Sequence, residues 1–240
     1  MIREHFEIKQ TAVTIISERK FIRVAKEAIF DARSQIEKKI LRDPFFGITY
    51  EPYAASDGDD IVIRRMCSSS LSASVGPMAA VAGAIAEYAV QKMKDNGAEY
   101  AIVDNGGDIA LICDRDVRIG MYANVNGEQL SLKIPPTCEI IGICSSSASI
   151  GPSVSFGRSD ISTVISNDVS LADACATALG NMISGRDNME EHLETICKIE
   201  GITGCLAYCD GMLGMCGDVP ELVSCGTNDH IITKLFYDNS

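Results

Sequence analysis

The sequence predicts an α+β fold in which antiparallel strands pack against helices. Apolar residues recur at helical spacing over residues 20–41, with charged residues on the opposite face, and this pattern predicts a long amphipathic helix. Asp210-Gly211 separates two short apolar segments, an arrangement that is typical of an antiparallel hairpin. Trp is absent and aromatic residues are few, so we expect an aliphatic core.

A serine-rich motif occurs twice in the chain. Cys67-Ser-Ser-Ser…Ser-Val-Gly-Pro and Cys144-Ser-Ser-Ser-Ala-Ser-Ile-Gly-Pro match with an offset of two residues, and each follows a predicted strand. We therefore interpret residues 1–240 as one pseudo-duplicated domain, with halves of roughly 1–110 and 111–240 that build one site between them. The alternative is a chance similarity between two serine-rich turns.

The remaining elements follow from the same periodicities. Proline at position 77 suits a first helical turn, and Asn96-Gly97 provides a helix stop. The sequence predicts an edge strand or hairpin over 6–17, a strand over 61–65, a helix from Pro77 to about Lys94, strands over 100–103, 109–113, 117–122 and 130–134, a helix over 188–199, and strands over 205–208, 212–215 and 231–237.

Charge and hydropathy narrow the range of partners. The net charge is −12, from 21 basic and 33 acidic residues, without a basic run, so we expect no nucleic-acid partner. The N-terminus has no apolar signal core, and no run of about 18 apolar residues occurs, so we expect no membrane partner and a reduced, cytoplasmic protein. Exposed sheet edges need covering, which favours a homodimer.

We expect residues 141–183 to form one wall of a ligand site. This stretch predicts a buried strand, a serine-rich turn ending at Gly151-Pro152, a second strand and a helix of small residues. Bulky and charged side chains are nearly absent, so backbone groups and hydroxyls face the neighbouring space. The residues that we predict to bind a small anionic ligand are Ser68, Ser69, Ser70, Gly76, Asn105, Gly106, Gly107, Asp108, Ser145, Ser146, Ser147 and Gly151.

The segment Asp104-Asn-Gly-Gly-Asp108 joins two predicted strands. Paired glycines permit positive φ and close backbone approach, so their N–H groups can face a phosphate or the edge of a flavin. The alternative is an ordinary hairpin turn with capping carboxylates, which the Asn-Gly pair supports equally well.

Asp173 and Thr177 stand four residues apart on one face of a predicted helix, which Asp168 or Ser170 would cap. A carboxylate and a hydroxyl at this spacing can offer oxygen ligands to Mg²⁺. The alternative is that the Thr177 hydroxyl bonds back to the carbonyl of residue 173 while the Asp173 carboxylate is solvated.

Cys67 and Cys144 are the predicted reactive thiols among ten cysteines. No two of the ten form a Cys-x-x-Cys pair, which argues against zinc ribbons and ferredoxin-type clusters. Each of the two would open a serine-rich turn whose hydroxyl and amide donors stabilise a thiolate. The alternative is that both are small apolar residues at strand ends.

Several motifs, in order, resemble the ApbE group. They are Asn105-Gly-Gly-Asp108, the serine-rich segment and Ala172-Asp-Ala-Cys-Ala-Thr-Ala-Leu179. Gly76-Pro-Met-Ala-Ala-Val-Ala-Gly83 and Ser155-Phe-Gly-Arg-Ser-Asp160 are similar to a smaller ApbE-like family of archaea and bacteria. The resemblance covers nearly the whole chain and implies an ApbE-like, tunnelling-fold-related architecture built from a duplicated unit.

The resemblance to ApbE implies a Mg²⁺-dependent transferase that moves FMN from FAD onto a protein Thr or Ser. By position, Gly106, Gly107 and Asp108 would line the flavin-nucleotide site, while Asp173 and Thr177 would hold the metal beside the pyrophosphate. The chain departs from ApbE in two respects. Ser149-Ile-Gly-Pro152 lacks the histidine of the His-x-x-Asp-Pro element of ApbE, and we expect no export signal, because the N-terminal residues have no apolar core.

The resemblance to the smaller family implies a different activity. In methanogens this family is associated with sulfide assimilation, including homocysteine formation from aspartate semialdehyde, which implies a thiol that carries a persulfide. Our first expectation is an accessory protein of sulfur assimilation that binds a small anionic ligand, meets other sulfur-assimilation proteins and handles sulfur at Cys67 or Cys144. The alternative is an FMN transferase or a non-catalytic flavin- or nucleotide-binding protein, with Mg²⁺ and FAD as the implied cofactors.

Overall fold

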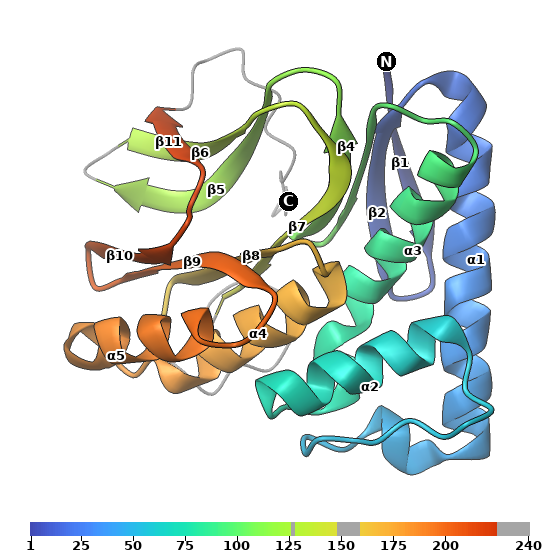
Figure 1. The fold of residues 1–240 in the computed structure, drawn as a ribbon, viewed down its shortest axis with the longest axis horizontal. Helices are drawn as coiled ribbons and strands as arrows, with labels where there is room; N and C mark the ends of the chain where they lie inside the picture. Colours follow the sequence, from blue (N-terminus) through green and yellow to red (C-terminus); the bar gives the residue numbers. More distant parts are fainter. Residues whose placement is uncertain (126–127, 148–158, 225–240) are drawn as a thin grey trace, which may run out of the picture.

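The computed structural model describes residues 1–125, 128–147 and 159–224 of the chain. Its central layer is an eight-stranded sheet in the order β1-β2-β3-β4-β7-β8-β9-β10, in which every neighbouring pair is antiparallel (Figure 1). The strands of this sheet are β1 (Ile2–Ile8), β2 (Thr11–Ser17), β3 (Ala101–Asn105), β4 (Asp108–Cys113), β7 (Thr137–Ser146), β8 (Ile161–Ser166), β9 (Ile202–Cys209) and β10 (Met212–Gly217).

A small second sheet and the helices cover the two faces of the central sheet (Figure 1). The second sheet has the order β11-β6-β5 and contains β5 (Val117–Val125), β6 (Glu128–Ile134) and β11 (Glu221–Ser224). The helices are α1 (Arg19–Arg42), α2 (Ile61–Ala73), α3 (Val81–Asp95), α4 (Val169–Met182) and α5 (Arg186–Cys197), with 3-10 turns η1 (Pro44–Gly47) and η2 (Pro77–Ala80).

Two apolar clusters hold these layers together. Helices α3, α4 and α5 pack on one face of the central sheet, and α1 and α2 pack against them. On the other face, Leu111, Ile143 and Leu206 of the central sheet contact Ile119 and Leu132 of the small sheet. The core is aliphatic, as expected, because Ile, Val, Leu and Ala fill both clusters.

Most elements lie where the sequence predicts them, and the α+β fold with antiparallel sheets is confirmed. The helix predicted over 20–41 is α1, and Asp168 rather than Ser170 caps α4, where its Oδ1 accepts the Leu171 N–H at 2.9 Å. The hairpin between β9 and β10 turns at Asp210-Gly211, both with positive φ. The strand predicted over 231–237 lies outside the described residues.

The strand predicted over 61–65 is wrong, because this segment begins helix α2. The β-branched sequence Ile61-Val-Ile favoured a strand locally. However, the buried residues Val62, Met66 and Ala73 recur at helical spacing, and the small serines between them allow α2 to lie against alanine-rich α4. Tertiary packing has overridden local propensity here.

This difference also removes the serine motifs as evidence for the internal repeat. Cys67 and the serines after it lie on α2, whereas Cys144 lies on β7. The two motifs are therefore not equivalent turns, and the alternative of a chance similarity fits the structure. The proposed division between residues 110 and 111 would fall inside β4.

Among the described residues, no single helix is long and apolar enough to cross a membrane. Helices α2 and η2–α3 together pass a test of length and composition, although they are bent by 110° at their junction. Both are core helices in this fold, with buried faces that contact α1 and α4.

Candidate functional site

A cavity of about 950 Å³ opens where the layers meet. Its walls come from the segment after η1, the segment between α2 and η2, the β3–β4 turn, strand β5, the adjoining ends of β7 and β8, and helix α4. The volume lies at the upper end of the range of small-molecule sites, about 300–1,000 Å³. The site is therefore large enough for a dinucleotide, and it gathers residues that are far apart in the sequence.

One end of the cavity carries two carboxylates, of which Asp173 is buried and Asp108 is half-buried. Asp108 at the start of β4 and Asp173 on α4 both line it. The Gly83 N–H donates to Asp173 Oδ2 at 2.7 Å, and this bond ties α4 to α3. The close crossing needs glycine, because a Cβ at position 83 would lie 2.6 Å from the Val169 carbonyl oxygen. The sequence thus fixes the position of the Asp173 side chain through a helix crossing.

The carboxylates have raised pKa values. Burial raises the pKa of Asp173 to about 7, although backbone N–H groups at Gly83 and Ala82 oppose this shift. Burial also raises the pKa of Asp108 well above its ordinary value, and the neighbouring charges of Asp173 and Asp104 raise it further. No lysine or arginine is among the described lining residues. An anionic ligand at this end would therefore need a cation beside it.

Thr177 lines the cavity one helical turn after Asp173, as predicted. The alternative interpretation has Asp173 solvated, which is wrong, because its side chain is buried with 7% exposure. Thr195 on α5 illustrates the back-bonded alternative, since its hydroxyl donates to the Glu191 carbonyl at 2.8 Å. Within the described part of the chain, Thr177 makes no such bond, so its hydroxyl is available to the cavity.

The paired glycines form the β3–β4 hairpin turn and also line the cavity. Gly106 and Gly107 have φ of 73° and 105°. The Gly107 N–H donates to Asp104 Oδ1 at 3.0 Å, so this donor belongs to the turn and does not face a phosphate. The interpretation as a hairpin turn therefore holds for Gly107. Gly106 borders open space, because no atom lies within 4 Å of the position that a Cβ at residue 106 would take.

The serines predicted to bind ligand divide into two groups. Ser145, Ser146 and Ser147 line the cavity, as do Gly76 and Asn105, and the Ser145 hydroxyl bonds to that of Thr163 at 2.8 Å. Ser68, Ser69 and Ser70 do not line it, because they lie on α2, and their predicted place in a site turn is wrong. Gly151 lies outside the described residues.

Neither predicted thiol has the environment of a reactive cysteine. Cys67 is buried on α2, and burial raises its pKa to about 11. Cys144 is buried on β7, where burial and the charge of Asp108 raise its pKa well above its ordinary value. Neither lines the cavity. The predicted thiolate stabilisation is wrong, and the alternative of small apolar residues fits both positions.

Alkylation will test this assignment directly. We expect Cys138, which is exposed, to react with a maleimide reagent in the folded protein, while Cys67 and Cys144 react at least about 100-fold more slowly because both need the core to open. Peptide mass spectrometry at a series of times measures each site separately. Fast labelling of Cys67 or Cys144 in the folded protein would contradict the burial described above.

Several lining residues were not among the site residues that the sequence predicts. Asp160 precedes β8, Asn181 ends the cavity-facing part of α4, and Ile119 and Met121 of the small sheet supply an apolar wall. Their places depend on contacts between distant segments, which no local spacing reveals. Neither described histidine lines the cavity: His5 bonds to Glu7 on β1, and His192 bonds to Asn188 on α5.

Comparisons with known proteins extend this picture. Residues 2–194 match the family model described as AbpE bacteria. The UPF0280 protein of Methanothrix thermoacetophila is 44% identical over 237 residues, which cover 98% of this chain and 100% of the relative. The UPF0280 protein of Archaeoglobus fulgidus is 44% identical over 240 residues, with 98% and 100% covered.

Two solved structures show the same fold. The flavin transferase ApbE from Vibrio cholerae has a TM-score of 0.60 at 15% identity and covers 90% of this chain and 96% of its own. The apo form of the Pseudomonas stutzeri flavinyl transferase ApbE has a TM-score of 0.61 at 12% identity, with 90% and 94% covered. At these identities the likeness concerns the fold and not the activity. The chain belongs to the AbpE bacteria family, together with the archaeal UPF0280 proteins, and has the fold of the ApbE flavin transferases.

Proposed function

We propose that the protein binds FAD in the cavity with Mg²⁺ and transfers FMN to a hydroxyl of an acceptor protein, as an ApbE-type flavin transferase. The observation that carries this proposal is the single cavity of about 950 Å³ that joins Asp108, Asp173 and Thr177 to an apolar wall. The Vibrio cholerae and Pseudomonas stutzeri proteins of the same fold are flavin transferases, which supports the choice of ligand.

The two ends of the cavity suit the two parts of a flavin nucleotide. Ile119, Met121 and Ile143 offer apolar surface that can cover a planar ring system. The hydroxyls of Ser145 and Thr163 and the open side of Gly106 border the same cavity and add polar surface to it. A ligand with an apolar ring and a charged pyrophosphate therefore meets matching surfaces along its length.

The donor set fits Mg²⁺. The ion is commonly held by one or two carboxylates, water and the phosphates of its substrate, so a cage of three protein acids is not needed. This agrees with the absence of any metal-binding group of three His, Cys, Asp or Glu in the described ranges. Asp173 and Thr177, with Asp108 beside them, would hold the ion, which would neutralise pyrophosphate charge during cleavage.

The chain's own residues would bind and orient the reactants. In the proposed reaction, an acceptor hydroxyl oxygen forms a bond to the FMN phosphorus, the bond from that phosphorus to AMP breaks, and the hydroxyl proton leaves. The Gly83 N–H holds the Asp173 carboxylate in a fixed position, and the β3–β4 turn keeps Asp108 facing the same space. Such positioning lowers the entropic part of the barrier.

The decisive experiment is incubation of the protein with FAD, Mg²⁺ and the acceptor peptide of a known ApbE. We expect AMP release and a peptide that gains one FMN group by mass spectrometry, both abolished by EDTA. FAD binding followed by flavin fluorescence supplies a second measurement. Binding without AMP release would favour the non-catalytic flavin-binding alternative, and absence of both would overturn the proposal.

The sulfur-assimilation function finds no support in this structure. It required an accessible thiol of low pKa, whereas Cys67 and Cys144 are both buried thiols with raised pKa values. The relatives carry only the name UPF0280, which says nothing about sulfur. The flavin-nucleotide function is therefore the one that the cavity favours.

A further inference from the structure

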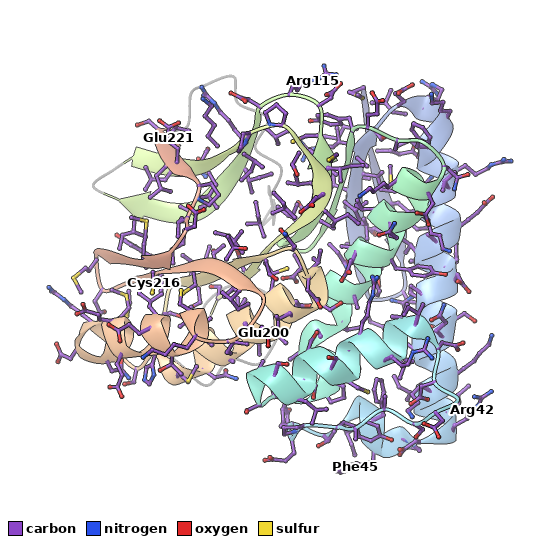
Figure 2. All side chains as sticks on the ribbon, viewed as in Figure 1. Arg42, Phe45, Arg115, Glu200, Cys216 and Glu221 are labelled. Atoms are coloured by element: carbon purple, nitrogen blue, oxygen red, sulfur yellow. The ribbon has the colours of Figure 1, made fainter. Side chains whose placement is uncertain are left out.

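Three cysteines gather away from the cavity, where helix α5 meets the β9–β10 hairpin. Cys197 is the last residue of α5, Cys205 lies on β9 and Cys216 lies on β10. Figure 2 shows Cys216 on β10 beside α5. None of the three lines the cavity, so the flavin proposal gives them no role.

Two of the sulfur atoms are in contact, and the third lies near them. Cys197 Sγ lies 3.5 Å from Cys205 Sγ, and Cys216 pairs with Cys205 across the β9–β10 ladder. Cys205 and Cys216 face each other across the antiparallel β9–β10 pair, so their side chains share one face of the sheet, toward α5. Gly217 adds to the crowding, since a Cβ there would lie 3.1 Å from Cys197 Sγ. Cys197 is thus the central sulfur of the group.

The three thiols differ in access to solvent. Cys197 and Cys216 are half-buried, whereas Cys205 is fully buried and donates to the Leu193 carbonyl at 3.4 Å. Burial raises the pKa of Cys205 strongly, so it remains a protonated thiol. Attack on sulfur requires a thiolate and an open path, and Cys205 has neither. Burial raises the pKa of Cys197 as well, so access to solvent is what distinguishes Cys197 and Cys216 from Cys205 and makes them the reactive pair.

A metal centre is the competing use of clustered thiols. Zinc, the metal that thiolates commonly bind, takes three or four protein ligands at defined distances. Over residues 1–125, 128–147 and 159–224, no group of three His, Cys, Asp or Glu has such an arrangement. Two accessible thiols on the same face of the β9–β10 pair favour redox chemistry instead.

We propose that Cys197 and Cys216 are a reversible oxidation site, which closes a disulfide between α5 and β10 when the protein meets hydrogen peroxide. In the first step the thiolate of one cysteine attacks the peroxide, the O–O bond breaks, and a sulfenic acid and hydroxide form; the hydroxide takes up the proton that the thiol released and leaves as water. In the second step the other thiol attacks the sulfenic sulfur, the S–S bond forms and a second water leaves. The two thiols supply two electrons to one peroxide, and a dithiol reductant reverses the change by exchange.

The disulfide would tie the end of α5 to the edge strand of the central sheet. It would close a loop of about 20 residues that contains the whole of β9, and such loops stabilise mainly by restricting the unfolded chain. For a chain of this size we expect a rise in Tm of about 5 °C on oxidation. The site is independent of the flavin proposal, so FAD binding is expected to be unchanged by oxidation.

The test uses the full chain with Cys138→Ser, which removes an exposed thiol that could cross-link molecules. After treatment with hydrogen peroxide, non-reducing peptide mapping should show the Cys197–Cys216 linked peptide, and dithiothreitol should release it. Cys216→Ser should abolish the linkage and the Tm rise, whereas the matched variant Cys205→Ala should retain both.

Three results would overturn the proposal. They are a linkage between Cys197 and Cys205, a Tm rise that persists in Cys216→Ser, and oxidation of Cys197 to sulfinic acid without any cross-link. Peptide mapping of the protein with Cys205 and Cys216 intact identifies the linked pair directly, so the test does not depend on the folding of a variant.

Discussion

Replacing Asp173 with asparagine is expected to lower the rate of AMP release from FAD by roughly 100-fold or more, because several kcal/mol of charge stabilisation at the metal are lost. The substitution keeps the shape of the side chain, and the asparagine Oδ1 can still accept the Gly83 N–H. Initial rates with saturating Mg²⁺ and FAD measure the effect.

The same variant is expected to be at least as stable as the parent protein at pH 8 in EDTA. The pKa of Asp173 is about 7 in the folded protein and 3.8 ordinarily, so the folded state holds the proton more tightly than the unfolded chain. Stability linked to this carboxyl is therefore present at low pH and is lost as pH rises from about 3.8 through 7. Asparagine does not titrate, so the Tm of the Asp173→Asn variant should fall less than that of the parent protein as pH rises over this range.

Asp187→Asn is the matched control, because Asp187 is an exposed carboxylate in the first turn of α5 and does not line the cavity. It should leave the rate unchanged. An Asp173→Asn protein that is folded and retains full activity would show that Asp173 does not hold the catalytic metal, whatever its stability.

Replacing Gly83 with alanine is expected to destabilise the protein by about 2 kcal/mol and to lower its Tm by roughly 4–8 °C. Alanine favours a helix over glycine by about 1 kcal/mol, which alone would raise stability. The added Cβ, however, would lie 2.6 Å from the Val169 carbonyl oxygen and 2.7 Å from Asp173 Cβ, so α3 and α4 must move apart. The clash costs more than the helix propensity contributes, so we expect Gly83→Ala to be less stable than the parent protein.

Activity should fall together with stability in this variant, since the Gly83 N–H to Asp173 bond of 2.7 Å would lengthen. Thermal unfolding and AMP release measure the two effects. Gly58→Ala is the control, because nothing lies within 4 Å of its Cβ position, and we expect no change there. A Gly83→Ala protein that is more stable than the parent would mean that the two helices have room to separate without cost.

Local patterns predicted the fold better than the site. Amphipathic periodicity predicted helix α1, and the turn residues Asp210-Gly211 predicted the β9–β10 hairpin. Both signals are contained within a short stretch of the sequence. The strand predicted over 61–65 failed because the burial of α2 against α4 is decided by a partner over a hundred residues away.

The sequence also predicted only part of the candidate site correctly. Asp108, Asp173 and Thr177 were found because carboxylates and a hydroxyl stand out among small residues. The serines at 68–70 were predicted to bind ligand because their sequence resembles that of residues 145–147. However, residues 68–70 lie on helix α2, whereas Ser145 and Ser146 are at the end of strand β7. Composition alone cannot distinguish the two, since the backbone conformation decides where a hydroxyl points.

The central sheet continues beyond the residues that match the family model. The family match ends at residue 194, inside α5, but the main-chain ladder runs on from β8 into β9 and then β10. A fragment cut at the limit of the match would leave the β8 backbone as a bare edge with unpaired amide and carbonyl groups, the kind of surface on which chains associate. The limit of the family match therefore does not coincide with the limit of the central sheet, and β9 and β10 close this edge of the sheet.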